Sequence, residues 1–255
     1  MLNLRMSVSL PRCVILIVLC GLVKFSFGQQ PVAPQPNTTK YIYFTFDDGP
    51  LYGSDGVNRV IKEEQIKTNV FIVGQHAFNS KALMEFYKGY LANPLIEVGN
   101  HSFTHASDHY TAYYSKPDSV LRDFFKCQHA LNIPYKFARQ PGRNQWRLPS
   151  VRKDDLKSGS ESADLLYKNG FKVYGWDVEW QHNSRTSSPL QSVDAMLNQI
   201  DKLFASGKTV KPGHLIVLAH DEMFRKPGDE AKLKLLIQKL KERGYRFEHL
   251  SNYPG

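Results

Sequence analysis

The sequence predicts an α/β fold: a distorted (β/α) barrel with parallel strands in a single domain, with an open doubly wound sheet as the alternative. Short apolar runs alternate with segments of helical periodicity from residue 40 onward, as in β-α-β units. A chain of 255 residues, 42% of them hydrophobic and 22% charged, can bury a core without disulfide or metal support. Charged or imidazole-bearing residues follow five of the apolar runs, as expected where parallel strands end on a common face.

The predicted elements alternate in order along the chain. Strands are expected at the short apolar runs, residues 41–46, 69–73, 95–98, 171–176 and 214–219. Helices are expected where apolar residues recur at helical spacing, at residues 57–66, 81–91, 117–131, 193–204 and 230–240. Val120, Leu121 and Phe124 give the third helix its apolar face, and Arg243 with Gly244 is typical of the end of a helix.

The first 28 residues have the features of a secretory signal peptide. Arg5 and Arg12 precede an almost wholly apolar run at residues 13–23, and Ser26 and Gly28 are small residues suited to cleavage near Gly28. The run is shorter than the roughly 20 apolar residues of a membrane-spanning helix, which favours cleavage over an uncleaved membrane anchor. We therefore expect a secreted or periplasmic protein.

The remainder of the chain divides into a linker and one domain. Residues 29–39 hold three prolines and no periodic apolar pattern, which predicts a linker before a domain at 40–255. The net charge is +9, but no basic run with interleaved aromatic residues marks a nucleic-acid groove. No glycine-rich fingerprint follows a strand, so a nucleotide is not expected either. Cys127, beside Phe124 and Phe125, is expected to be inert core.

Five segments at the ends of apolar runs carry the candidate chemistry. They are DDGP at 47–50, NHSFTH at 100–105, RQPGR at 139–143 after the short run 136–138, WDVEW at 176–180 and HD at 220–221. In a (β/α) barrel, side chains just past the carboxyl ends of the strands converge on one face. The sequence therefore predicts that these segments share a site.

Two histidines and a carboxylate predict a metal site. His101 and His105 are four residues apart, so a helical turn would present both imidazoles to one ion. One carboxylate of the pair Asp47 and Asp48 would complete a set of two histidines and one carboxylate. The other would stay free to take a proton from the attacking water. An ordinary turn with solvated acids is the alternative for this segment.

The remaining polar residues at the strand ends predict acid catalysis. His220 could protonate a leaving group, with Asp177 or Glu179 as the carboxylate that keeps it charged near neutral pH. Arg139 would pair with the free aspartate, keep it ionised and orient it. A core histidine bonded to a backbone carbonyl is the alternative for His220.

The aromatic residues and the other histidines carry less information. Trp176 and Trp180 could line a wall on which a sugar stacks, or could fill the core. Structural roles are expected for the other six histidines, namely His76, His109, His129, His182, His214 and His249.

The five segments together resemble the motifs of a known family. TFDDGP at 45–50 and NHSFTH at 100–105 are similar to the first two motifs of the polysaccharide deacetylases, carbohydrate esterase family four, built on the NodB homology domain. RQPGR at 139–143, WDVEW at 176–180 and VLAHD at 217–221 follow in the order of the remaining three. The resemblance covers residues 40–255, which it identifies as a catalytic domain with a distorted (β/α) barrel.

The resemblance implies a role for each matching residue. It implies Asp47 as general base, Arg139 as the residue that steadies it, and His220 as general acid. It implies a divalent metal, commonly zinc, bound by Asp48, His101 and His105. The backbone N–H of Gly142 would help to hold the oxyanion.

Two departures from the family pattern concern the substrate groove and the acid. The third motif usually has an aromatic residue after its proline, and Gly142 stands there instead. The acid–tryptophan ending of the fourth motif fits 179–180 in one alignment, and a longer alignment aligns His182 and Asn183 with it. The carboxylate partner of His220 is therefore open.

We expect a metal-dependent hydrolase that removes N- or O-linked acetyl groups from a polysaccharide or oligosaccharide. A secreted glycan-binding protein with a silent deacetylase fold is the main alternative. Two histidines and a carboxylate would also suit a non-haem iron oxygenase, although Asp47 and His220 have no obvious task there. An amidase acting on a non-sugar amide would use the same residues. The identity of the glycan and the oligomeric state stay open.

Overall fold

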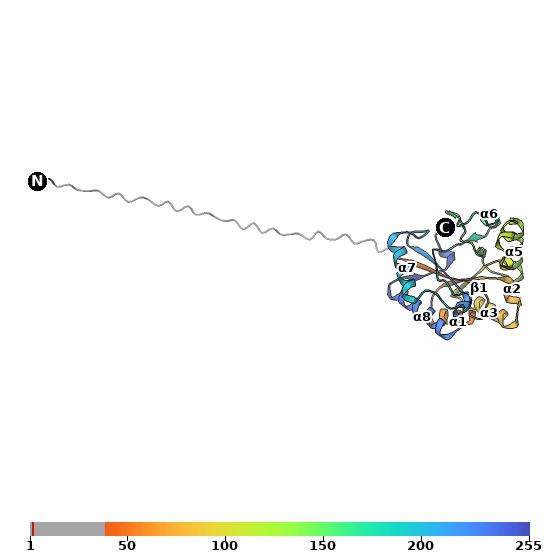
Figure 1. Ribbon diagram of the computed structural model, residues 1–255, viewed down its shortest axis with the longest axis horizontal. Helices are drawn as coiled ribbons and strands as arrows, with labels where there is room; N and C mark the ends of the chain where they lie inside the picture. The colour runs from red at the N-terminus through yellow and green to blue at the C-terminus, as the bar shows by residue number, and fades with distance from the viewer. Residues whose placement is uncertain (1, 3–38) are drawn as a thin grey trace. The chain divides into compact units, whose positions relative to one another are not determined.

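The computed structural model describes Leu2 and residues 39–255, drawn in colour in Figure 1. The expected signal peptide, apart from Leu2, and the linker up to residue 38 lie outside the described residues. In the described part, ten strands form one sheet in the order β6-β5-β7-β4-β3-β2-β1-β9-β8, with β10 also paired to β1. The strands are β1 Tyr41–Gly49, β2 Thr68–Ile72, β3 Ile96–Asn100, β4 Phe137–Ala138, β5 Trp146–Leu148, β6 Val151–Lys153, β7 Lys172–Val173, β8 Val178–Glu179, β9 His214–His220 and β10 Arg246–Phe247.

The pairing of the strands confirms the distorted (β/α) barrel. All neighbours pair in parallel except β5, which runs antiparallel to both β6 and β7. In the described residues the two end strands, β6 and β8, do not pair with each other, so the barrel is not closed. The hairpin of β5 and β6 departs from the predicted parallel arrangement, because a two-residue connection joins these strands and only antiparallel strands can be joined so tightly.

Helices lie around the outside of this sheet (Figure 1). They are α1 Ser54–Glu64, α2 Gly74–Phe78, α3 Lys81–Leu91, α4 Tyr110–Tyr114, α5 Pro117–Ala130, α6 Ser160–Lys168, α7 Val193–Ser206 and α8 Pro227–Glu242, with the 3-10 turns η1 His105–Asp108, η2 Asp221–Phe224 and η3 Leu250–Asn252. The five predicted helices are confirmed as α1, α3, α5, α7 and α8. The sequence did not predict α2, α4 and α6, and α2 and α4 are too short to show an apolar period.

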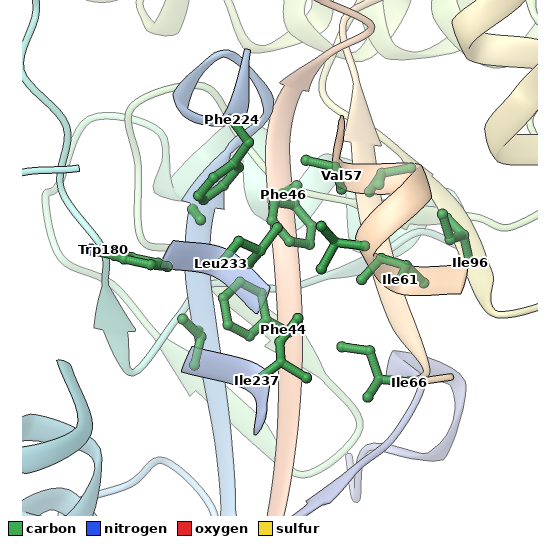
Figure 2. Close-up of a cluster of buried hydrophobic side chains, with 14 of the residues drawn as sticks. Phe44, Phe46, Val57, Ile61, Ile66, Ile96, Trp180, Phe224, Leu233 and Ile237 are labelled. Atoms are coloured by element: carbon green, nitrogen blue, oxygen red, sulfur yellow. The ribbon is translucent and has the colours of Figure 1, made fainter. Parts of the chain in front are cut away.

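The outward side chains of the central strands form the main core. In β1 the alternate residues Ile42, Phe44 and Phe46 are fully buried on this face. Figure 2 shows Phe44 and Phe46 among side chains of α1 and α8, namely Val57, Ile61, Leu233 and Ile237. Because successive residues of a strand point to opposite faces, this burial leaves the other half of β1 on the inner face of the barrel.

The inner face changes from aromatic to polar along the strands. Tyr43 packs against Ile216 in a second buried cluster, and Thr45 and Asp47 follow it on the same face of β1. The register of β1 and β9 pairs Asp47 with His220. The polar residues therefore gather at the carboxyl end of the sheet.

Two further residue-level findings concern the core and the membrane. Cys127 is fully buried, and burial raises the pKa of its thiol, in agreement with an inert core residue. Among Leu2 and residues 39–255, no helix combines the length and the apolar character that crossing a bilayer would require.

Candidate active site with a metal-binding group

Three strands bring polar side chains to one cavity at the carboxyl end of the sheet. Asp47 is near the end of β1, His220 ends β9, and His101 directly follows β3. Ile96 and Val98 of β3 face the outer core, so the alternation turns His101 inward. The cavity has a volume of about 390 Å³ and is lined by Asp47, Asp48, His101, His105, Tyr110, Gln140, Gly142, Asp155, Trp176, Glu179, His182, Leu218 and His220.

Two imidazole nitrogens and one carboxylate oxygen meet in this cavity. Asp48 Oδ1 lies 3.1 Å from His105 Nε2 and 3.4 Å from His101 Nε2. One ligand atom of each residue lies within 4.8 Å of the other two. Asp48 Oδ1 is buried without a hydrogen-bond partner. A buried polar atom requires a partner, and a bound cation would supply one. Two imidazoles and a carboxylate suit a divalent transition metal, so the residues fit such an ion.

Electrostatics within this group favour an ionised carboxylate. Burial alone would raise the pKa of Asp48, but the imidazoles of His101 and His105 outweigh it and hold the pKa well below its usual range. Burial likewise opposes a charge on His105, yet the neighbouring Asp48 raises the pKa of His105 above its usual value. Asp48 is therefore available as an anionic ligand at neutral pH.

The backbone of Asp48 is held in an uncommon conformation. Its φ is +71°, in the left-handed region that few residues other than glycine adopt. His76, from α2, lies with Nδ1 2.7 Å from the Asp48 carbonyl oxygen. Gly49 leaves room for the neighbouring Asp221, whose carboxylate lies only 2.2 Å from where a Cβ would stand. These contacts fix the direction of the Asp48 side chain.

Different local structures orient the two histidines. His101 Nδ1 lies 2.8 Å from the carbonyl oxygen of Arg139, which leaves Nε2 directed to the ligand group. His105 opens a run of four left-handed residues, 105–108, and Ser102 Oγ accepts a hydrogen bond from its backbone N–H. The expected helical turn from 101 to 105 is therefore wrong. The imidazoles still converge, with ring centroids 5.2 Å apart, because a strand end and a left-handed turn carry them.

Arg139 forms a buried ion pair with Asp47. Its Nη1 donates to Asp47 Oδ1 and to Thr45 Oγ1, each at 2.8 Å. Its other nitrogens donate to the carbonyl oxygens of Tyr174 and Gly175. Asp47 Oδ2 lies 3.7 Å from His101 Nε2, so the aspartate held by Arg139 stands directly beside the metal-binding group.

The aromatic ring of Phe71 packs against the arginine of this ion pair. The Arg139 guanidinium carbon lies 4.3 Å from the centroid of the Phe71 ring, which projects from β2. Gly99 of β3 makes space for that ring, because a Cβ there would lie 2.8 Å from Phe71 Cδ1. The guanidinium thus lies against the Phe71 ring while its Nη1 donates to Asp47.

His220 has no carboxylate partner among the described residues. Its Nδ1 is buried without a hydrogen-bond partner. The Asp177 carboxylate instead accepts the backbone N–H groups of Val210 and Ile216, at 2.7 and 2.8 Å. Glu179 lines the cavity but makes no side-chain hydrogen bond to His220. Neither of the two expected partners therefore pairs with His220 in this structure.

Another histidine ring lies against that of His220. The rings of His182 and His220 lie 4.8 Å apart at an interplanar angle of 63°. Burial, and secondly the proximity of His220, lowers the pKa of His182. His182 is one of the two residues that the longer alignment of the fourth motif aligns with its usual acid–tryptophan ending.

Of the three remaining predicted site residues, two line the cavity and one is buried in the core. Gly142 and Trp176 line the cavity. Trp180 does not: its ring is fully buried in the outer core, 5.7 Å from the ring of Phe224, and its Nε1 donates to the Gln191 carbonyl (Figure 2). Trp176 alone of the two tryptophans can therefore contact a ligand.

Sequence reasoning missed three residues of the site. His76, Tyr110 and His182 had no motif spacing to single them out, and two of them were expected to have structural roles. Only the alternative alignment of the fourth motif pointed to His182. The contacts of His76 and Tyr110 depend on how α2 and α4 dock, which the local pattern does not indicate.

Comparisons with known proteins agree with this geometry. A family model described as polysaccharide deacetylase matches residues 35–155. A chitin disaccharide deacetylase of Vibrio alginolyticus is 28% identical, over 93% of this chain and 76% of the relative. A peptidoglycan-N-acetylglucosamine deacetylase of Bacillus cereus is 25% identical, over 82% of this chain and 68% of the relative.

A solved structure shows the same fold. A CE4 esterase from Streptococcus mutans superposes with a TM-score of 0.62 at 20% identity, over 84% of this chain and 87% of that chain. The motifs, the fold and the sequence relatives thus point to one family. The chain is thus similar to the polysaccharide deacetylases, a family of hydrolases, in its motifs, its fold and its sequence relatives.

Proposed function

We propose that this protein is a metal-dependent deacetylase that hydrolyses acetyl groups of a glycan. The observation that carries the proposal is the juxtaposition of two parts: the group of Asp48, His101 and His105, and the Asp47–Arg139 ion pair beside it. The match to the polysaccharide deacetylase model supports the reaction class, and relatives named as chitin disaccharide and peptidoglycan deacetylases support an acetylated glycan as substrate. We propose zinc as the ion, since it suits two imidazoles and a carboxylate.

The three ligands define what the site gains from an ion. A divalent cation held by Asp48, His101 and His105 would polarise the acetyl carbonyl and lower the pKa of a water ligand from 15.7 towards about 7. Asp48 contributes its charge, and the backbone of Arg139 keeps His101 in the required orientation. The site then needs a base, an oxyanion donor and an acid from this chain.

Asp47 is the proposed general base. Arg139 holds one of its oxygens at 2.8 Å, so the other, Oδ2, is free to accept the proton of the attacking water. Asp47 is almost wholly buried, which strengthens its ion pair with Arg139.

Gly142 and His220 are proposed to complete the reaction. The Gly142 N–H would donate to the oxyanion, a contribution of roughly 3–4 kcal/mol in well-studied sites. His220, across the cavity, would then protonate the departing amine or hydroxyl as acetate forms. An amine is the poorer leaving group, so the acid matters more for an N-acetyl substrate than for an ester.

Acetate release tests the proposal. The zinc-loaded protein is incubated with N-acetylated chito-oligosaccharides and with an O-acetylated polysaccharide, and acetate is measured over time. We expect release that exhaustive chelation abolishes and zinc restores. Tyr167→Ala, an exposed substitution on α6, is a matched control that keeps the activity.

The alternatives give different results. A silent glycan-binding protein would bind the oligosaccharide and release no acetate, with or without zinc. An amidase for a non-sugar amide would release acetate from small acetamides and from none of the glycans. Either result, or release that survives exhaustive chelation, would overturn the proposed function.

Export is a separate part of the proposal. The pattern of Arg5, Arg12 and the apolar run at 13–23 supports a cleaved signal peptide and action on a glycan outside the cytoplasm. Expression of the full chain with N-terminal analysis of the extracellular protein tests it. A mature N-terminus close to residue 29 is expected, and retention of the intact chain in the membrane fraction would contradict it.

A further inference from the structure

Gly142 stands where the third motif of the family usually has an aromatic residue, and it lies against the ring of Tyr110. Its φ is +61°, and a Cβ built there would lie 3.1 Å from Cε1, 3.3 Å from Cζ and 3.4 Å from Cδ1 of Tyr110. Those three atoms belong to one edge of the Tyr110 ring. The space above Gly142 is therefore filled by an aromatic ring that comes from α4, another part of the chain.

Several contacts hold the Tyr110 ring at this position. Its plane is nearly perpendicular to the ring of His105, with centroids 6.0 Å apart. The guanidinium of Arg143 lies 5.7 Å from the Tyr110 centroid and 4.6 Å from that of Tyr114. Tyr114 also donates a hydrogen bond to the Pro141 carbonyl. Helix α4 is thus docked onto the segment that contains Gly142.

Arg143 itself is anchored and cannot easily move away. Its nitrogens donate to the Ser158 carbonyl and hydroxyl oxygens, each at 3.1 Å, and to the Gly142 carbonyl at 2.8 Å. The ring of Tyr110 is consequently half-buried and preorganised, and it lines the cavity. Rigid aromatic surfaces of this kind contribute much of the apolar contact area in binding sites.

We propose that Tyr110 is a specificity-determining residue of the deacetylase site, the wall against which the sugar ring that carries the acetyl group packs. This inference rests on the proposed function and names one surface of that site. The ring lies between His105 of the metal-binding group and Gly142, the proposed oxyanion donor. A sugar packed on it would have its acetyl group held next to both, which lowers the entropic cost of reaching the reactive arrangement.

The test measures sugar binding separately from turnover. Tyr110→Ala and Tyr110→Phe are made in an Asp47→Asn background loaded with zinc, and binding of tetra-N-acetylchitotetraose is measured by calorimetry. We expect Tyr110→Ala to weaken binding at least tenfold and Tyr110→Phe to stay within about threefold of the parent, because the ring surface is retained. Tyr167→Ala, on the exposed face of α6, should bind like the parent.

Zinc affinity and turnover complete the design. Zinc titration should give the same affinity for all variants, and in the active protein Tyr110→Ala should raise KM for the oligosaccharide more than it lowers kcat. Equal binding by Tyr110→Ala and the parent would overturn the proposal, as would no binding by the parent. An equal loss in Tyr110→Phe, or a loss of zinc in Tyr110→Ala, would assign Tyr110 another role and also overturn it.

The two proposals fail in different ways. If the unsubstituted protein releases no acetate while Tyr110→Ala still weakens binding, the role of Tyr110 in sugar binding is supported and the deacetylase activity is overturned. If acetate is released normally and Tyr110→Ala binds like its parent, the deacetylase activity is supported and the role of Tyr110 in sugar binding is overturned.

Discussion

The carboxylate of Asp47 and the guanidinium of Arg139 form an ion pair 2.8 Å long in which neither side chain has more than a few per cent of its surface exposed. The pair links the two halves of the site, since the backbone carbonyl of the same arginine also orients His101. A buried charge without its partner is far more costly than the intact pair. Both catalysis and stability should therefore depend on Arg139.

Arg139→Met should both destabilise and inactivate the protein. The substitution leaves the Asp47 carboxylate buried and unpaired, a loss on the order of 3–5 kcal/mol in the free energy of unfolding. Urea denaturation measures this loss, and acetate release measures the activity. The control is the double variant Arg139→Met with Asp47→Asn, which removes both charges and so leaves neither one buried without its partner. An Arg139→Met variant no less stable than this double variant would show that the unpaired Asp47 carboxylate is not the source of the effect.

Adjacent aspartates should have separable roles. Asp48→Ala and His105→Ala remove ligands, so zinc content and turnover should fall together. Asp47→Asn should keep zinc but lose about 10²–10⁴-fold in turnover, the usual contribution of a general base. Metal analysis after dialysis, together with acetate release, separates the two effects. An Asp47→Asn enzyme with more than about a hundredth of the normal rate would exclude Asp47 as the base.

The neighbour of His220 should influence the alkaline limit of activity. Burial and the proximity of His220 lower the pKa of His182, so this imidazole is neutral near pH 7 and supplies no negative charge. His182→Asp would place an anion beside His220 and favour its protonated form. The alkaline limb of the pH profile of kcat/KM should then move up by about one pH unit.

The control for this change is His182→Asn, which is polar but uncharged. It should leave the alkaline limb where it is in the unsubstituted protein. If His182→Asp and His182→Asn give the same pH profile, then His220 does not act as the general acid, or the side chain at 182 does not influence it.

The sequence was sufficient for the parts of the site that depend on local pattern. The strand runs ending at Asp47 and His220 are local features, and two-residue alternation then turns both side chains inward. The convergence of Asp48 with His101 and His105 followed from the expectation that parallel strand ends share one face.

Other parts depended on packing that no local pattern encodes. Trp176 and Trp180 belong to one segment, yet Trp180 lies in the outer core and Trp176 on the cavity, because the chain bends at Asp177 between Trp176 and β8. The Asp177 carboxylate caps backbone N–H groups of Val210 and Ile216, contacts between segments more than thirty residues apart. Such pairings are set by the docking of whole elements.

Asp221 should make the stability of the fold decrease as pH rises. It is fully buried beneath the turn at Gly49, and its Oδ2 accepts hydrogen bonds from Tyr90 and Ser54. Burial raises the pKa of Asp221 from 3.8 to about 7, and the negative charges of Asp48 and Asp47 act in the same direction. Between these two pH values the folded protein keeps a proton that the unfolded chain has released. The stabilising effect of that proton is complete below about pH 4 and is lost as pH rises through about 7.

Asp221→Asn removes this titration and should become more stable relative to the unsubstituted protein as pH rises. At 1.36 kcal/mol per pH unit, the relative gain between pH 4 and pH 8 is up to about 4 kcal/mol. Urea denaturation of both proteins at pH 5 and pH 8 measures most of this difference. Asp229→Asn is the matched control: the pKa of that buried aspartate is lowered, so its substitution should give the same stability difference at both pH values. A difference for Asp221→Asn that is equally constant would mean that Asp221 is ionised in the folded protein throughout this range.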